Sequence, residues 1–213
     1  DLSDHLLERF KAEGIDALIS VAGGRGPTIL YKLHRKGLDA VCIPRSVEND
    51  VAATDVSFGF NSTLSFTIEM LDRARQAAQS ARMIGVVEVL GSQAGWLALQ
   101  SGIAVRADSV LIPEIPYRVA HLVASLKEMV TPDRPYGLVV VASGAKCVDT
   151  SQDEEKPSTY RASLSPLTTG DTSEHVIQYS GGAANFVATE LQRHLATETR
   201  SVVLGDWSRC GSP

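Results

Sequence analysis

The sequence has few cysteines and no long apolar segment. Its three cysteines, Cys42, Cys147 and Cys210, are odd in number, lie far apart and form no C-x-x-C pair. This pattern argues against a disulfide framework or a cysteine-based zinc site and favours reduced thiols. The longest apolar runs have the length of a strand, so we expect no membrane span. We also expect no signal peptide, and therefore a cytoplasmic protein.

An excess of positive charge is also missing. The 20 basic and 25 acidic side chains give a net charge of −5, which offers no support for nucleic-acid or membrane binding. Anionic small molecules stay open as ligands, because a phosphate site depends on local arginines and backbone amides. The 213 residues suffice for a sizeable core in one large or two small domains. Because the chain starts at Asp1 and stops at Gly-Ser-Pro, we expect it to be part of a longer protein.

Apolar runs of strand length alternate with amphipathic segments along the chain. The runs predict strands at 17–22, 40–43, 83–90, 109–112, 136–142 and 201–204. The segments between them have helical spacing, and the longest predicted helix begins at Asn61. This alternation predicts an α/β fold, with a layered parallel sheet and helices on both of its faces. Functional groups are then expected in the loops that follow strands, at 23–27, 44–56, 91–93, 113–117 and 143–147.

One segment interrupts the alternation. Residues 146–182 are rich in Ser, Thr, Asp and Glu, which predicts a long surface loop without chemistry of its own. We therefore expect three regions: a central α/β region at 1–145, an inserted polar loop at 146–182, and a helix–strand segment at 183–213 that returns to the site.

The stretch from Val41 to Phe60 contains the densest group of reactive side chains. An apolar run closed by Pro44 is followed by Ser46, Glu48, Asp50, Thr54 and Asp55. In open α/β sheets, ligands bind at the carboxyl ends of strands. Glu48 and Asp50 are separated by one residue in this loop, and one could meet a substrate while the other meets a metal or a backbone amide. The spacing also allows a solvated turn whose acids cap the next helix.

Five segments together resemble the 6-phosphofructokinase family. They are G-G-R-G at 23–26, I-P-R-S-V-E-N-D at 43–50, R-M-I-G-V-V-E-V-L-G at 82–91, P-E-I-P at 113–116, and E-T-R-S-V-V-L-G-D-W-S-R-C-G-S-P at 198–213. The resemblance covers nearly all of the chain outside residues 146–180, and only part of the family's length. It implies the family's α/β fold and its reaction in glycolysis, the transfer of a phosphoryl group from ATP or pyrophosphate to the 1-hydroxyl of fructose 6-phosphate. It also implies a homodimer or homotetramer.

The resemblance implies a role for each matching position in the catalytic and donor loops. Ser46 and Glu48 occupy the places of a hydroxyl and an aspartate that meet the sugar's 1-hydroxyl, where the acid acts as the general base. Asp50 matches a second acid near a magnesium ion. The phosphate-donor loop corresponds to Gly23, Gly24, Arg25 and Gly26.

The sugar-phosphate side of the resemblance covers Arg82, Leu90, Gly91, Ser92, Glu114, Arg200, Asp206 and Arg209. Arg82 and Arg200 match arginines that bind the sugar 6-phosphate from a neighbouring subunit, and Arg209 matches a further arginine of that pocket. Glu114 matches an acid that contacts the sugar hydroxyls. Guanidinium groups suit phosphate oxygens, and although a single arginine is more often a surface charge, three in matching places argue for a phosphate site.

Besides Glu48, which replaces an aspartate, and Leu90, which replaces a methionine, four positions depart from the family pattern. Arg25 stands where an aspartate usually holds Mg²⁺, which needs oxygen ligands, and Pro27 replaces a hydroxyl residue. Ser92 replaces an arginine that stabilises phosphate, and Asp206 replaces a histidine beside the 6-phosphate. Two alternatives therefore stay open: a pyrophosphate donor, and a catalytically silent subunit that binds sugar phosphate or nucleotide in a regulatory or structural role.

Overall fold

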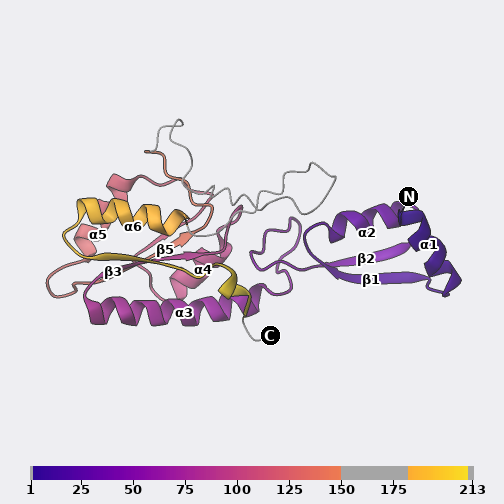
Figure 1. Ribbon diagram of the computed structural model, residues 1–213, viewed down its shortest axis with the longest axis horizontal. Helices are drawn as coiled ribbons and strands as arrows, with labels where there is room; N and C mark the ends of the chain where they lie inside the picture. Colours follow the sequence, from indigo (N-terminus) through magenta and orange to yellow (C-terminus); the bar gives the residue numbers. More distant parts are fainter. Residues whose placement is uncertain (1, 150–181, 211–213) are drawn as a thin grey trace, which may run out of the picture. The chain divides into compact units, whose positions relative to one another are not determined.

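The computed structural model describes residues 2–149 and 182–210 (Figure 1). Its elements are α1 (Leu2–Ala12), β1 (Ala17–Ala22), α2 (Gly26–Arg35), β2 (Asp39–Pro44), α3 (Phe60–Ala81), β3 (Ile84–Val89), α4 (Trp96–Ala104), β4 (Ser109–Leu111), α5 (Val119–Met129), β5 (Gly137–Ala142), α6 (Gly182–His194), β6 (Thr199–Val203) and the 3₁₀ helix η1 (Gly205–Cys210). Most of the predicted polar loop, residues 150–181, lies outside the described residues. The expectation of an α/β fold with parallel strands is confirmed, and the chain divides into two compact units, Asp1–Asn61 and Ser62–Ser212.

The first unit contains a two-stranded parallel sheet. β1 and β2 pair from Ala17 opposite Asp39 to Ala22 opposite Pro44. Pro27 lies in the first turn of α2, where a missing N–H costs nothing, and Leu30 and Leu33 form the buried side of that helix. α2 packs against this sheet, and residues on the other face, including Ile19 and Val41, are exposed.

Lys36 joins the two helices of the first unit. Its Nζ donates to the Ser3 hydroxyl and to the Asp4 carboxylate, both at 2.6 Å. The hydrogen bond from Lys36 lowers the pKa of Asp4 below its ordinary value. This contact lies at the carboxyl end of α2, away from the loops that follow the strands.

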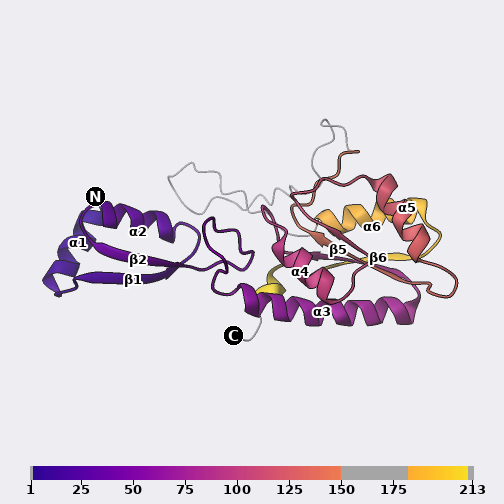
Figure 2. The ribbon, with the colours of Figure 1, turned by 180° about the vertical axis from the view of Figure 1, so that it is seen from behind.

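The second unit contains a four-stranded sheet in the order β4-β5-β3-β6, and every pairing in it is parallel. Every residue of the neighbouring strands β3 and β5 is buried, as their continuous apolar runs predict. α5 and α6 lie on one face, where Ile84, Val86, Leu126 and Leu191 join one core cluster. α3 and α4 cover the other face, so this sheet has helices on both faces, as predicted (Figures 1 and 2).

Glu88 is the acid within the otherwise apolar run of β3. Glu88 is 1% exposed, and its Oε2 accepts the N–H of Ala184, in the first turn of α6, at 3.0 Å. The first amides of a helix have no partner within the helix, and the helix dipole favours a negative charge there. Glu88 therefore stabilises the start of α6 against the sheet. None of the helices in the described part of the chain is long and apolar enough to cross a bilayer.

Candidate functional site

The glycine loop and the acid-rich loop lie side by side at the carboxyl edge of the first unit's sheet. The Arg45 N–H donates to the Ala22 carbonyl at 2.9 Å, which extends the pairing of the two strands beyond Pro44. A Cβ added to Gly23 would lie 2.4 Å from the Arg45 carbonyl oxygen, so only glycine allows this approach. The structure thus brings together two of the loops that the sequence predicts to be functional.

One backbone amide of the glycine loop is already engaged. The Gly26 N–H donates to the Gly23 carbonyl at 3.1 Å, and Pro27 has no N–H. The Arg25 carbonyl accepts the Ile29 N–H at 3.1 Å, while its exposed side chain makes no hydrogen bond or ion pair with another described residue. Its guanidinium is therefore the positive group that this loop offers to an anion in solution.

A network of hydrogen bonds orders the acid-rich loop. The Ser46 hydroxyl donates to Asp50 Oδ1, and the Glu48 N–H donates to Ser46 Oγ at 3.2 Å. Asp50 is exposed, and Glu48 is half-buried. Because the hydroxyl hydrogen of Ser46 is directed to Asp50, a lone pair of Oγ remains to accept a hydrogen bond from a ligand hydroxyl.

Asn49, between the two acids, was not predicted to have a role. Its backbone has a φ of 53°, in the left-handed region. Its Nδ2 donates to the Asp55 carbonyl at 3.1 Å, and its Oδ1 accepts the Ser57 N–H at 2.8 Å. The signal in the sequence was the residue type itself, since asparagine favours left-handed backbone and bonds readily to nearby backbone groups.

Three loops meet at the carboxyl edge of the four-stranded sheet in the second unit. The Gly144 N–H donates to the Gly91 carbonyl at 2.9 Å, which joins the loops after β5 and β3. Glu114 Oε1 accepts the Gly95 N–H at 2.8 Å, just before α4, which joins the loop after β4. The carboxylate of Glu114 thus stabilises this loop and lies at the edge where the sequence predicts a ligand.

The remaining residues at this edge differ in how far their side chains are accessible to a ligand. Leu90 is buried, so only its backbone could contact a ligand, and Ser92 is half-buried. Arg209 Nε donates to Asp206 Oδ1 at 3.0 Å within η1, which follows β6. This ion pair offsets part of the repulsion that Asp206 would exert on a phosphate. It also occupies the Nε–H donor of the Arg209 guanidinium.

Arg82 and Arg200 lie at the opposite edge of the four-stranded sheet. Arg82 precedes β3 and has a φ of 52°, and Arg200 pairs in register with Gly85 near the start of that strand. Arg200 Nε donates to Glu198 Oε1 at 2.7 Å. A strand of about six residues spans roughly 20 Å, so these arginines and Ser92 cannot contact one phosphate group within the same second unit.

Tyr117 links the loops that follow β4 and β5. Its N–H donates to the Lys146 carbonyl at 2.9 Å. Burial, together with Cys147, Glu190 and Asp149 nearby, raises the pKa of its phenol well above the ordinary value. The phenol of Tyr117 therefore stays neutral at neutral pH.

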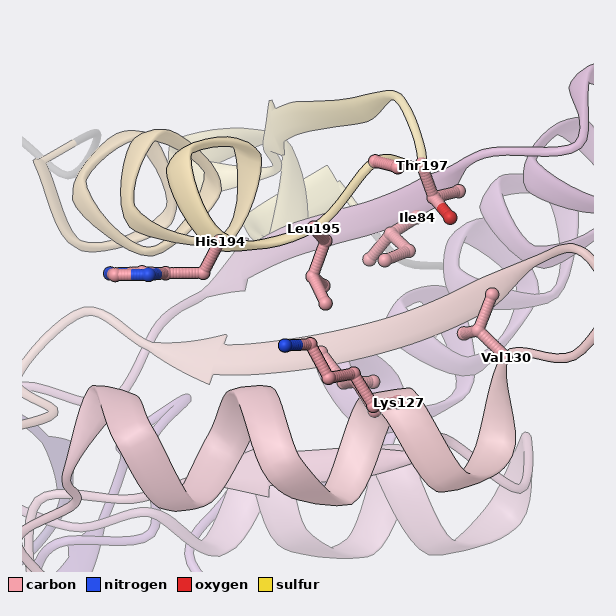
Figure 3. A pocket seen from close by; sticks show the side chains of 8 residues that line it. Ile84, Lys127, Val130, His194, Leu195 and Thr197 are labelled. Atoms are coloured by element: carbon pink, nitrogen blue, oxygen red, sulfur yellow. The ribbon is translucent and has the colours of Figure 1, made fainter.

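A pocket of about 360 Å³ lies between the carboxyl ends of α5 and α6 (Figure 3). It is lined by Ile84, Leu126, Lys127, Val130, His194, Leu195, Ala196 and Thr197. In Figure 3 the side chain of Lys127 extends from α5 toward the segment that follows α6. Ile84 is the first residue of β3, so this pocket lies at the amino-terminal edge of the sheet, away from Ser92 and Glu114.

No group of three or more His, Cys, Asp or Glu side chains that could hold a metal occurs among residues 2–149 and 182–210. A nucleotide-bound Mg²⁺ needs less than that, because phosphates and water supply most of its ligands and one or two carboxylates complete them. Asp50, with one oxygen engaged by Ser46, fits the part of a single carboxylate ligand. Arg25 does not fit, because a guanidinium has no acceptor.

Comparison with known proteins gives a consistent family. A family model described as Phosphofructokinase matches residues 1–213. "ATP-dependent 6-phosphofructokinase 2" of Clostridium perfringens is 38% identical over 213 residues, covering 100% of this chain and 55% of that protein. "Pyrophosphate--fructose 6-phosphate 1-phosphotransferase" of Amycolatopsis methanolica is 33% identical over 205 residues, covering 94% of this chain and 55% of that protein. The chain therefore spans about half the length of the curated relatives it matches.

Solved structures agree with this assignment. The pyrophosphate-dependent phosphofructokinase of Nitrosospira multiformis has a TM-score of 0.73 at 24% identity, covering 97% of this chain and 49% of that one. The phosphofructokinase of Saccharomyces cerevisiae has a TM-score of 0.67 at 27% identity, covering 94% of this chain and 26% of that one. With the family model matched from end to end, the chain belongs to the phosphofructokinase family.

Proposed function

We propose that the protein transfers a phosphoryl group from ATP or pyrophosphate to the 1-hydroxyl of fructose 6-phosphate, as a glycolytic enzyme of the cytoplasm. The observation that carries this proposal is the family match over residues 1–213, shared with relatives named for this reaction with either donor. The hydrogen-bonded loop with Ser46, Glu48 and Asp50 supports it, because an acid and a hydroxyl are present where the acceptor alcohol would bind.

Glu48 is the proposed general base. An alcohol is a poor nucleophile until its proton is accepted, so the Glu48 carboxylate takes the proton of the 1-hydroxyl as its oxygen attacks the terminal phosphorus of the donor. The bond from that phosphorus to the bridging oxygen breaks, and ADP or phosphate leaves with the electron pair. Ser46 Oγ orients the acceptor hydroxyl through its remaining lone pair.

The donor phosphates are proposed to bind at the glycine loop, 23–26. Arg25 supplies a fixed positive charge beside phosphate oxygens, and Asp50 would hold a donor-bound Mg²⁺ together with phosphate oxygens and water. The metal, when bound, supplies positive charge that neutralises the phosphates. Since Arg25 replaces the acid that usually holds this metal, we expect weaker metal dependence than in a typical family member.

The sugar 6-phosphate is proposed to bind arginines from two subunits of a homodimer or homotetramer. Arg82 and Arg200 lie at the amino-terminal ends of the strands, whereas Arg209 lies beyond their carboxyl ends. This distance supports the arrangement, because one chain does not bring the three arginines around one phosphate. Arg209, with Glu114 for the sugar hydroxyls, would complete the pocket. The alternative of a silent regulatory subunit draws no support from the relatives' names.

A coupled assay on the full-length protein tests the proposal. Fructose 6-phosphate is offered with Mg²⁺ and either ATP or pyrophosphate, and formation of fructose 1,6-bisphosphate is measured. We expect turnover with at least one donor. Absence of product with both donors, in a protein that is folded by circular dichroism, would reject the proposed function.

A further inference from the structure

We propose that Asn49 is a positioning residue that holds Glu48 and Asp50 in place for phosphoryl transfer; this inference rests on the proposed function. Asn49 joins the segment that carries the two acids to the far side of the same loop. Its Nδ2 donates to the Asp55 carbonyl at 3.1 Å, and its Oδ1 accepts the Ser57 N–H at 2.8 Å. One side chain thus uses both a donor and an acceptor to close the loop.

The backbone of Asn49 contributes separately from its side chain. With a φ of 53°, the chain turns at Asn49, directly between Glu48 and Asp50. This left-handed turn accompanies the contact of the Ser46 hydroxyl with Asp50 and of the Glu48 N–H with Ser46 Oγ. The direction in which each acid points therefore depends on the conformation that Asn49 holds.

The base of the loop is tied independently of Asn49. The Ser46 N–H donates to the Phe58 carbonyl at 3.1 Å, and the Phe58 N–H donates to the Pro44 carbonyl at 3.0 Å. Loss of the Asn49 side chain would consequently leave the ends of the loop in place and release its middle, where Glu48 lies. Ser57 is 2% exposed, so its N–H would also lose its partner in a site that water reaches poorly.

Two substitutions separate the backbone role from the side-chain role. Asn49→Gly keeps access to the left-handed backbone and removes both side-chain hydrogen bonds. Asn49→Ala removes the same bonds and in addition disfavours the left-handed backbone. Lys36→Ala is the matched control, because it breaks the contacts of Lys36 with Ser3 and Asp4 in the same unit without touching this loop.

The experiment measures kcat, KM for fructose 6-phosphate and Tm in the full-length protein for these variants. We expect Asn49→Gly to lower kcat by about 10- to 100-fold with KM changed less than about threefold, because misplacement of a catalytic group by about 1 Å costs rate on this scale. Lys36→Ala should lower Tm with kcat retained. An unchanged kcat in Asn49→Gly, or a loss no larger than in Lys36→Ala at an equal loss of Tm, would overturn the inference.

Hydrogen–deuterium exchange keeps the inference testable without activity. If the parent protein shows no turnover with either donor, the proposed function fails, and exchange in peptides spanning residues 46–58 decides the role of Asn49 alone. Faster exchange in these peptides of Asn49→Gly, with unchanged exchange in β1 and β2, supports the inference that the Asn49 side chain holds the loop closed. Equal exchange in the parent and the variant rejects it.

Discussion

Glu48 is one methylene longer than the aspartate that the family resemblance places at its position. The proposed base must reach the acceptor hydroxyl, and its backbone N–H is already tied to Ser46 Oγ at 3.2 Å, which limits how far the residue can shift. We predict that Glu48→Gln, which keeps the size and removes the proton-accepting carboxylate, lowers kcat by about 10²–10⁴-fold while sugar-phosphate binding is largely kept. Steady-state kinetics and calorimetry measure the two quantities.

Glu48→Asp is the control for this prediction. It keeps a carboxylate and shortens the side chain, so it should retain more activity than Glu48→Gln if proton acceptance is the property that matters. Turnover in Glu48→Gln equal to that of the parent protein would reject Glu48 as the base.

Arg25 gives the donor loop a positive charge that does not depend on a metal. It is exposed and has no ion-pair partner among the described residues, so its guanidinium can approach a phosphate without breaking another contact. We predict that calorimetric titration detects ATP or pyrophosphate binding without Mg²⁺, and that Arg25→Ala abolishes that binding. Arg25→Lys, which keeps the charge and loses the planar fork, should bind with intermediate affinity.

Two other results would each contradict the prediction for Arg25. Binding that strictly requires Mg²⁺ would mean that the metal ligands lie elsewhere. No binding under any condition would mean that the loop does not receive the donor. A single unit charge is also less than the metal supplies, so transfer from ATP should be slow even where binding persists.

The sequence identified the residues of the acid-rich loop but not how they contact one another. Ser46, Glu48 and Asp50 stand out by residue type alone, because acids and a hydroxyl follow a strand that ends at a proline. The hydrogen bonds of Asn49 with Asp55 and Ser57 join residues six and eight positions apart. Such bonds depend on the path of the whole loop, which no local pattern encodes.

At the scale of the elements, apolar runs predicted the strands well. The run at 136–142 became β5, Gly137–Ala142, and the helical spacing after Asn61 became α3, Phe60–Ala81. The order β4-β5-β3-β6 and the division of the strands between two sheets were not predicted. Pairing between strands is decided by contacts far apart in the sequence, whereas each apolar run is a local signal.

Gly144 allows the loops after β3 and β5 to approach each other closely at the candidate site of the second unit. A Cβ at this position would lie 2.1 Å from the Ser92 carbonyl oxygen and 3.0 Å from that of Gly91, so the loops after β3 and β5 would have to separate. We predict that Gly144→Ala lowers the free energy of unfolding by about 1–3 kcal/mol, the usual cost of overpacking. Urea unfolding followed by circular dichroism measures the change.

Gly85→Ala is the matched control for Gly144→Ala. Its added Cβ would find its nearest neighbours, Ala78 and Leu138, at an ordinary contact distance of 3.6 Å. We expect a much smaller loss of stability from it. Equal losses of unfolding free energy in the two variants would show that the close approach of the loops at Gly144 does not require glycine there.

At the scale of the whole molecule, the placement of the arginines favours a phosphate pocket shared between subunits over a pocket built from one chain. Arg82 and Arg200 lie at the amino-terminal edge of the four-stranded sheet, and Arg209 follows β6 at the carboxyl edge. A shared pocket in a homo-oligomer removes this conflict, because each chain then supplies one edge to its own site and the other edge to its partner's site. Dilution should dissociate the oligomer and abolish sugar-phosphate binding together, as sedimentation and calorimetry can measure.

Subunit mixing gives the sharpest test of that arrangement. Glu48→Gln and Arg82→Ala each disable every site of a pure oligomer, the first by removing the proposed base and the second by removing a phosphate contact. In a hybrid of the two, one kind of shared site takes Glu48 from the Arg82→Ala chain and Arg82 from the Glu48→Gln chain. That site has both native residues and is intact. We predict that dissociating and reassociating a mixture of the two inactive proteins restores part of the parent activity at low fructose 6-phosphate. If Glu48 and Arg82 served the same site from one chain, every site in the hybrid would still lack one of them, and the mixture would stay as inactive as its components.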